Sequence, residues 1–285
     1  MFSDYINAIP QYLLPKQALN RFAQFMANLR VPWIKNYLIQ NFVKDYQVDM
    51  REALEPDPLQ YGSFNDFFIR QLKPGARVIA HADVVSPVDG SISEIGYLTD
   101  GRLLQAKGRY YSVMSLLASD EMPYSHFQQG CFATLYLSPK DYHRVHMPID
   151  GVLQETIYVP GTLFSVQPKT VRVVPNLFAR NERLVTLFST SLGPMVMVLV
   201  GAAIVGTIGT VWEGDVIRSS VIQRTVYANE QKSGLVIAKG SEMGYFKLGS
   251  TVIVLFSDRH AMQWLTHFAA GASIQLGQAL GSASN

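Results

Sequence analysis

The chain has 285 residues, of which 48% are apolar and 16% are charged, and its formal net charge at pH 7 is +2. So few charges among so many apolar residues exclude a disordered chain and indicate a folded protein of one large or two small domains. The small net charge gives no support for a nucleic-acid partner. The single cysteine, Cys131, excludes an intramolecular disulfide bond.

Residues 1–75 have the pattern of helices. Apolar residues recur there at intervals of three and four, the spacing of an amphipathic helix. Pro32 suits the first position of a second helix. Ser63 and Asp66 form an N-terminal capping pair for a third helix, which should continue to Pro74. The apolar positions of the first two helices are Leu19, Phe22, Met26 and Leu29, followed by Ile34, Leu38 and Phe42.

The same region is locally basic. Residues 1–44 hold five cations against Asp4 alone, a net charge of +4. Apolar stripes beside scattered cations are typical of helices that lie in an anionic membrane surface, where each basic group contributes about 1 kcal/mol. Packing on the rest of the protein is the alternative, and we prefer it for the third helix. The cations are Lys16, Arg21, Arg30, Lys35 and Lys44.

From residue 76 onward, turn-forming pairs separate β-branched runs, which predicts one β-rich domain over residues 76–285 and an α+β fold overall. The stretch from Leu184 to Trp212 has no charged residue. Its glycines divide it into pieces of strand length, so we predict buried strands there instead of a membrane-spanning helix. The turn-forming pairs are Asp89-Gly90, Asp100-Gly101, Asp150-Gly151, Pro160-Gly161 and Glu213-Gly214.

A Gly249–Ser250 pair stands where a polar stretch enters an apolar, β-branched run. A serine hydroxyl can attack the carbonyl just behind it here, because glycine has no Cβ and leaves that carbonyl open. The attack turns the amide into an ester, and elimination from the ester leaves a new N-terminal group made from the serine. Taken alone, such a pair is more often a bulge or turn that leads into a core strand.

Candidate partners for Ser250 lie upstream. His143 and His146 are three residues apart, a spacing that sends side chains to opposite faces of a strand but can bring them together in a turn or helix. Asp89 precedes a glycine in an ordinary turn signal. Serine, histidine and aspartate are the groups that activate a weak hydroxyl nucleophile.

Two other functions remain open from the residues alone. His143, His146 and Asp89 are of the types that bind zinc, as in a metal-dependent hydrolase, although the His-Xaa-Xaa-His spacing lies outside the better-specified zinc motifs. That function leaves Ser250 without a role. A non-enzymatic β protein on a membrane surface would explain the N-terminal helices but not the histidines and the serine.

Segments spread over nearly the whole chain resemble the signature segments of the phosphatidylserine decarboxylase family, in its bacterial, membrane-associated, pyruvoyl-dependent type. They occur in order and without large insertions. The three most specific are Val88-Asp89-Gly90, Tyr142-His143-Arg144-Val145-His146-Met147-Pro148 and Phe246-Lys247-Leu248-Gly249-Ser250-Thr251, and the others are residues 67–75, 107–112, 181–183 and 200–202.

The resemblance implies decarboxylation of phosphatidylserine to phosphatidylethanolamine and carbon dioxide through a Schiff base with a pyruvoyl group, a covalent cofactor made from Ser250. It assigns Asp89 and His146 to a triad with Ser250 for self-cleavage after Gly249, and His143 to the decarboxylation. A large chain of residues 1–249 and a small chain of residues 250–285 would result. The resemblance also implies peripheral attachment to an anionic membrane surface on the cytoplasmic face of the cell membrane. It implies no metal, and it leaves a homodimer open.

Overall fold

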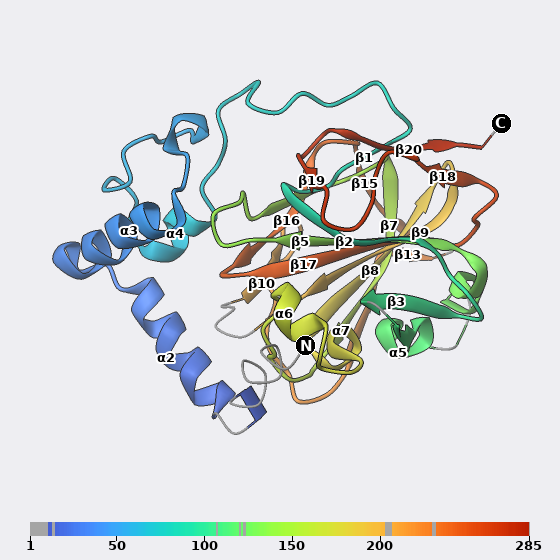
Figure 1. Cartoon of the computed structure of the whole chain (residues 1–285), viewed down its shortest axis with the longest axis horizontal. Coiled ribbons are helices and arrows are strands. Elements are labelled where there is room, and N and C mark those ends of the chain that lie inside the picture. The colour runs from blue at the N-terminus through green and yellow to red at the C-terminus, as the bar shows by residue number, and fades with distance from the viewer. Residues whose placement is uncertain are drawn as a thin grey trace.

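The structure is a computed structural model that describes residues 11–12, 15–106, 108–119, 121, 124–202, 207–229 and 232–284. A helical arm stands to one side of a β-rich body, which confirms the predicted α+β fold (Figure 1). The part of the predicted helical region in residues 1–10, with Asp4, lies outside the described residues. The arm consists of α2 (Lys16–Asn28), α3 (Pro32–Tyr46), the short 3-10 helix η1 (Met50–Glu52) and α4 (Phe64–Phe68).

The two later helices of the arm pack together through aromatic rings. Phe42 of α3 lies edge-on to Phe64, Phe67 and Phe68 of α4, with ring centroids 5.1, 5.9 and 5.9 Å apart. The predicted apolar stripe of the second helix therefore faces the protein. The predicted cap of α4 is confirmed, because the Ser63 hydroxyl accepts a hydrogen bond from the backbone N–H of residue 66 at 3.1 Å.

Helix α4 is shorter than the sequence indicates. It ends at Phe68 and does not continue to Pro74. Leu72 instead forms an isolated antiparallel bridge with Ala53, so the chain after α4 runs alongside the segment that precedes it. The Ser63 cap therefore identified the start of α4 from the sequence. Its end depends on the bridge between Leu72 and Ala53, which forms only in the folded protein.

The outer surface of α2 and α3 is apolar and uncovered. Phe22, Phe25 and Trp33 are 64%, 62% and 75% exposed. Lys35 differs from the expectation for a membrane-facing cation, since it is buried and its ammonium group donates to the Leu59 carbonyl at 2.7 Å. The exposed surface thus has fewer cations and more aromatic rings than the sequence indicated.

The body is built on a nine-stranded antiparallel sheet in the order β12-β7-β8-β9-β17-β5-β2-β19, with β15 also paired to β7. A four-stranded sheet, β11-β10-β16-β6, carries the segments that lead into the site. Short helices α5 (Val113–Leu117), η2 (Tyr124–Gln129), α6 (Pro168–Val171) and α7 (Leu177–Arg180) complete the body. The strands are β1 (Val84–Val85), β2 (Gly90–Tyr97), β3 (Arg102–Ala106), β4 (Arg109–Ser112), β5 (Cys131–Leu137), β6 (Arg144–His146), β7 (Gly151–Val159), β8 (Arg183–Thr190), β9 (Gly193–Val200), β10 (Thr207–Thr210), β11 (Gly214–Asp215), β12 (Gln223–Val226), β13 (Ala228–Asn229), β14 (Lys232–Ser233), β15 (Leu235–Ile237), β16 (Glu242–Lys247), β17 (Ser250–Phe256), β18 (Met262–Trp264), β19 (Ser273–Ile274) and β20 (Ala279–Ala283).

The central strand β17 is buried on both faces. Ile253 and Leu255 belong to one core cluster, which also contains residues of α5 and α7. Val252 and Val254 point the other way, into a second cluster that contains residues of β6, β10 and β16. Alternate residues of a strand face opposite sides of a sheet, so a strand between two cores must be apolar at every position. This explains why residues 252–256 of β17 are all apolar.

The apolar stretch after Leu184 forms β8, β9 and β10, as predicted. In the part of the chain that the structure describes, no helix combines the length and apolarity needed to cross a bilayer. Cys131 is fully buried at the start of β5, and burial raises the pKa of its thiol to about 12. A thiol with so high a pKa stays protonated and unreactive at neutral pH.

Candidate active site

The structure brings the candidate residues to one end of the nine-stranded sheet. Ser250, the first residue of β17, pairs with Leu137, the last residue of β5. Asp89 directly precedes β2, which pairs with the same end of β5 through Ser91. β6 carries His146 and pairs with β16, the strand just before β17. Strand pairing thus gathers segments that lie far apart in the sequence.

The backbone just before Ser250 is in an unusual conformation. Leu248 and Gly249 both have left-handed φ angles, of 77° and 57°. A branched residue such as leucine rarely adopts a positive φ, so this junction stores backbone strain next to the predicted scissile bond. The Ser250 hydroxyl is fully buried and has no hydrogen-bond partner among the described residues. A buried hydroxyl without a partner is energetically costly and is typical of a functional position.

Ser250 lines a cavity of about 220 Å³ between the arm and the body. Most of its wall is apolar, and the arm supplies part of it through Phe42, Tyr46 and Phe68. A mostly apolar cavity with a few polar groups in its wall is a usual form of a small-molecule site. The remaining lining residues are Tyr136, Leu137, Pro139, Ser165, Val166, Gln167, Ala202, Leu248 and Gly249.

His143 is a buried neutral imidazole. Its Nε2 lies 3.0 Å from the Ser138 carbonyl oxygen, which can only accept, so Nε2 carries the proton. Its Nδ1 has no hydrogen-bond partner in the part of the chain that the structure describes. The ring stacks on Phe68, a cavity residue, with centroids 4.1 Å apart. Burial, and then the nearby Arg70 guanidinium, lower the pKa of His143 to about 3. Near neutral pH the ring is therefore uncharged, and its Nδ1 lone pair is unused among the described residues.

Arg70 holds the loop that carries His143. This arginine is buried, and its guanidinium donates from Nη2 to the Lys140 carbonyl at 2.9 Å and the Asp141 carbonyl at 3.3 Å. Its Nε and Nη1 have no partner. This cation lies just after α4, so the arm contributes an electrostatic element to the site as well as part of the cavity wall.

His146 faces away from this cavity and lines a second one of about 430 Å³. Its Nδ1 donates to the Gly240 carbonyl at 2.8 Å, which leaves Nε2 to accept from the Tyr142 hydroxyl at 3.1 Å. Burial lowers the pKa of His146 as well. Residues 144–146 form a strand, so the spacing of three sends the two histidines to different surroundings.

Asp89 is held by an arginine that the sequence analysis did not single out. Arg77 donates from Nε to Oδ1 at 2.9 Å and from Nη2 to Oδ2 at 2.6 Å, a two-pronged ion pair. The backbone N–H of Leu276 also donates to Asp89, and Glu52 pairs with the same guanidinium at 2.8 Å. No motif marked Arg77, because its partner lies twelve residues on along the chain and meets it only in the folded protein.

The structure does not join Asp89, His146 and Ser250 by hydrogen bonds. Asp89 is paired with Arg77, both ring nitrogens of His146 are engaged, and the Ser250 hydroxyl is unpartnered. His143, which has a free Nδ1, shares Phe68 with the Ser250 cavity. The triad assignment therefore remains a prediction. Among the residues described, His, Cys, Asp and Glu form no group of three or more able to hold a metal ion.

A first prediction concerns stability in acid. The unfolded chain protonates His143 near pH 6.5, whereas the native chain does so only near pH 3. The unfolded state therefore binds more protons between these values, and stability falls as the pH falls through that window. We expect the urea-unfolding free energy of the uncleaved Ser250→Ala chain to drop by about 2 kcal/mol more between pH 7 and pH 5 than that of Ser250→Ala/His143→Gln. An equal drop in both would contradict the burial of a neutral His143.

Comparison with known proteins shows the family of the chain. A family model described as "Phosphatidylserine decarboxylase" matches residues 64–282, and a second model, described as "PSD", matches residues 6–47. A phosphatidylserine decarboxylase proenzyme of Legionella pneumophila (strain Lens) is 58% identical over 278 residues, with 98% of each chain covered. The proenzyme of Acidovorax ebreus is 51% identical over 280 residues, again with 98% of each chain covered. That of Yersinia enterocolitica is 52% identical over 260 residues, which cover 90% of this chain and 89% of the relative. The chain belongs to the phosphatidylserine decarboxylase family.

Proposed function

We propose that this protein converts phosphatidylserine into phosphatidylethanolamine and carbon dioxide, using a pyruvoyl group that it makes from Ser250 by cleaving its own chain after Gly249. Relatives named as phosphatidylserine decarboxylase proenzymes, similar over nearly the full length, support the reaction and the processing. The observation that carries the proposal is the Gly249–Ser250 junction, where a strained backbone precedes a buried hydroxyl without a partner.

In the proposed cleavage, the Ser250 hydroxyl oxygen attacks the Gly249 carbonyl carbon and the peptide bond becomes an ester. Elimination removes the Cα proton of Ser250 and breaks the bond between its Cβ and Oγ, which leaves a Cα=Cβ double bond and frees the Gly249 carboxylate. Addition of water and loss of ammonia then leave a ketone on the new chain. The attack requires a base for the hydroxyl proton, and His146, oriented by Asp89, is proposed for that role. For this step His146 must exchange the Tyr142 hydroxyl for the Ser250 hydroxyl.

The residues around Ser250 fit a pyruvoyl group. Ser250 lines a cavity whose wall is mostly apolar, and its hydroxyl, the group that the proposed chemistry removes, has no partner among the described residues. A pyruvoyl ketone bonded to the substrate amine supplies an electron sink for the charge left when carbon dioxide departs.

His143 is proposed to move the proton in the decarboxylation. Its Nδ1 has no partner among the described residues, so it can accept a proton from the incoming ammonium group of the substrate once the substrate carboxylate offsets the burial and the Arg70 charge that lower the pKa of the ring. It can then return a proton to the substrate carbon that has lost carbon dioxide. The Ser138 carbonyl, by accepting from Nε2–H, orients the ring for this role.

The experiment that tests the whole proposal is an intact mass measurement with an activity assay on the same sample. We expect two chains, of residues 1–249 and 250–285, with the N-terminus of the small chain blocked and reactive toward a carbonyl reagent. We also expect release of carbon dioxide from phosphatidylserine. A single uncleaved chain that carries the activity would refute the proposed cofactor.

The helical region of residues 1–75 is proposed to dock on the cytoplasmic face of the cell membrane, while residues 76–285 form the catalytic domain. A diacyl phospholipid does not leave its bilayer freely, so an enzyme that acts on its headgroup gains by binding where the lipid is concentrated. The uncovered rings on α2 and α3 suit insertion at the interface between water and lipid. The arm also walls the Ser250 cavity, so docking would bring that cavity close to the lipid.

Removing the exposed rings should weaken membrane binding. We expect Phe22→Ser/Phe25→Ser/Trp33→Ser to cleave normally but to bind anionic vesicles at least tenfold more weakly, because each inserted ring contributes about 1.5–3 kcal/mol. Activity on vesicles should fall by more than activity on a detergent-dispersed short-chain substrate. Co-sedimentation with vesicles measures the binding.

A matched control and a salt series complete this test. Tyr110→Ser removes a ring that is 53% exposed on β4, away from the arm, and should bind vesicles as the parent does. Binding by the parent should weaken as salt is raised, since salt screens its electrostatic part. If the triple variant sediments with vesicles as well as the parent, the docking surface lies elsewhere.

A further inference from the structure

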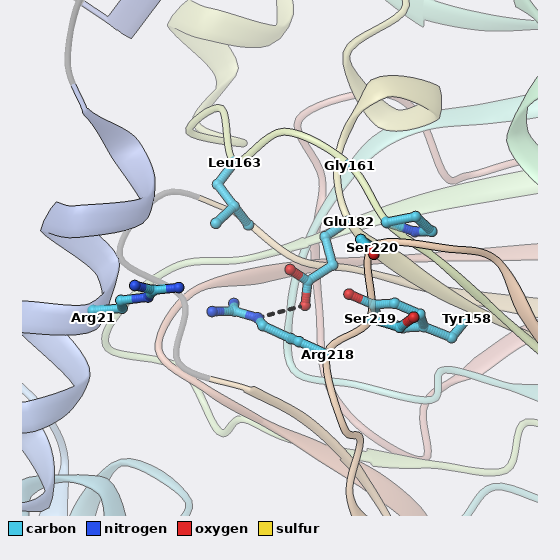
Figure 2. Close-up of a pocket in the computed structure, with 9 residues that line it drawn as sticks. Arg21, Tyr158, Gly161, Leu163, Glu182, Arg218, Ser219 and Ser220 are labelled. Carbon is cyan, nitrogen blue, oxygen red and sulfur yellow. Dashed lines mark hydrogen bonds and ion pairs between the residues drawn. The ribbon is translucent and has the colours of Figure 1, made fainter.

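A third cavity, of about 420 Å³, lies between α2 and the β body, apart from the cavities that Ser250 and His146 line. Figure 2 shows the side chains that line it, with Arg21 reaching in from α2 and Arg218 from the opposite side. Tyr158, Ser219 and Ser220 add hydroxyl groups to the lining. The remaining lining residues are Pro160, Gly161, Leu163 and Glu182.

Among the described residues that line this cavity, the charges do not balance. Arg218 Nε donates to Glu182 Oε1 at 2.9 Å, so that pair is neutral; the Glu182 side chain is only 9% exposed, whereas that of Arg218 is 34% exposed. Arg21 makes neither a hydrogen bond nor an ion pair within the described residues. Its guanidinium faces that of Arg218 across the cavity (Figure 2). Two like charges that converge on one space repel each other unless an anion lies between them.

The chemistry of these groups indicates which anion fits. Guanidinium groups bind phosphate oxygens through two parallel N–H bonds, and hydroxyl groups can donate to the remaining oxygens. The negative charge of Glu182 would repel an anion, but the positive charge of Arg218 neutralises it. Among the described lining residues, Arg21 then leaves a net charge of +1. A net charge of +1 suits a singly charged phosphodiester.

The surroundings of the cavity indicate the source of that anion. Arg21 precedes Phe22, whose exposed ring belongs to the surface proposed above to enter the membrane. An anion bound here therefore lies at the level of lipid headgroups. We propose that the cavity between α2 and the β body binds the phosphodiester of an anionic phospholipid headgroup, held between Arg21 and Arg218, as a second lipid site distinct from the Ser250 cavity. The bound lipid would fasten α2 to the body.

The site can be tested with a soluble probe that has no amine and cannot be decarboxylated. Glycerophosphoglycerol, the phosphodiester headgroup of an anionic lipid, should bind the mature two-chain protein with one-to-one stoichiometry in titration calorimetry. Arg21→Gln should weaken binding about tenfold or more, the usual effect of losing a charge-assisted hydrogen-bonded pair. Arg102→Gln, which removes an exposed arginine from β3, should bind as the parent does.

Two further measurements make the outcome decisive. The double variant Glu182→Gln/Arg218→Gln removes the Glu182–Arg218 ion pair without leaving either charge unpaired, and it should also fail to bind the probe. Inorganic phosphate distinguishes the two sources of the anion. If it binds as tightly as the phosphodiester and is lost in Arg21→Gln, the cavity is a phosphate site but the lipid source is wrong. If neither probe binds, or if Arg21→Gln binds both as the parent does, the proposed site is wrong.

Discussion

Ser250→Ala should leave a single uncleaved chain with no measurable decarboxylation. Alanine has no oxygen to attack the Gly249 carbonyl, so neither the ester nor the ketone can form. The buried position tolerates the change, since the lost hydroxyl has no hydrogen-bond partner. A denaturing gel and an intact mass measurement read out the cleavage, and release of carbon dioxide reads out the activity.

Variants of the proposed maturation partners sharpen this test. His146→Ala and Asp89→Asn should also block or greatly slow cleavage, the aspartate change acting through the orientation of the imidazole. Ser257→Ala, a hydroxyl removed just beyond the far end of β17, should cleave as the parent does. Normal two-chain processing of the His146 variant would overturn the triad and would favour His143, which has a free Nδ1, as the base.

His143→Ala should separate maturation from catalysis. If His143 serves only the decarboxylation, the variant still cleaves and still carries a reactive ketone. Its turnover should nevertheless fall by a factor of about a hundred or more, the usual cost of a missing proton-transfer group. Measuring cleavage, ketone content and carbon dioxide release on one sample gives all three quantities.

His260→Ala is the matched control for this variant, because it removes an exposed imidazole outside the site. It should cleave and turn over as the parent does. Loss of cleavage together with activity in His143→Ala would mean that His143 belongs to the maturation machinery or supports the fold. Full activity in that variant would show that another group moves the proton.

Local sequence was most informative where local physics decides the structure. The Ser63 hydroxyl caps α4 as its residue type predicts. Asp100 and Gly101 both adopt left-handed φ angles, of 51° and 67°, in the turn before β3. The end of α4 could not be predicted in the same way, because the bridge between Leu72 and Ala53 depends on a contact between distant segments.

The orientation of the arm also depended on tertiary contacts. An amphipathic pattern shows that a helix has an apolar face, but it does not show whether protein or lipid covers that face. In α3 the predicted face packs on the rings of α4, and the same packing draws Lys35 inward to the Leu59 carbonyl. Of the rings left exposed, Phe22 belongs to a predicted stripe, whereas Phe25 and Trp33 lie outside the predicted stripes.

The sequence by itself determined the α+β fold, the buried strand after Ser250 and the identity of the candidate reacting residues, because these follow from short-range patterns and short motifs. Only the tertiary structure decided how those residues are partnered. It paired Asp89 with Arg77, engaged both nitrogens of His146 and left His143 Nδ1 and the Ser250 hydroxyl free. The physical reason is that hydrogen bonds and ion pairs in a buried site form between segments that strand pairing brings together, whatever their separation along the chain.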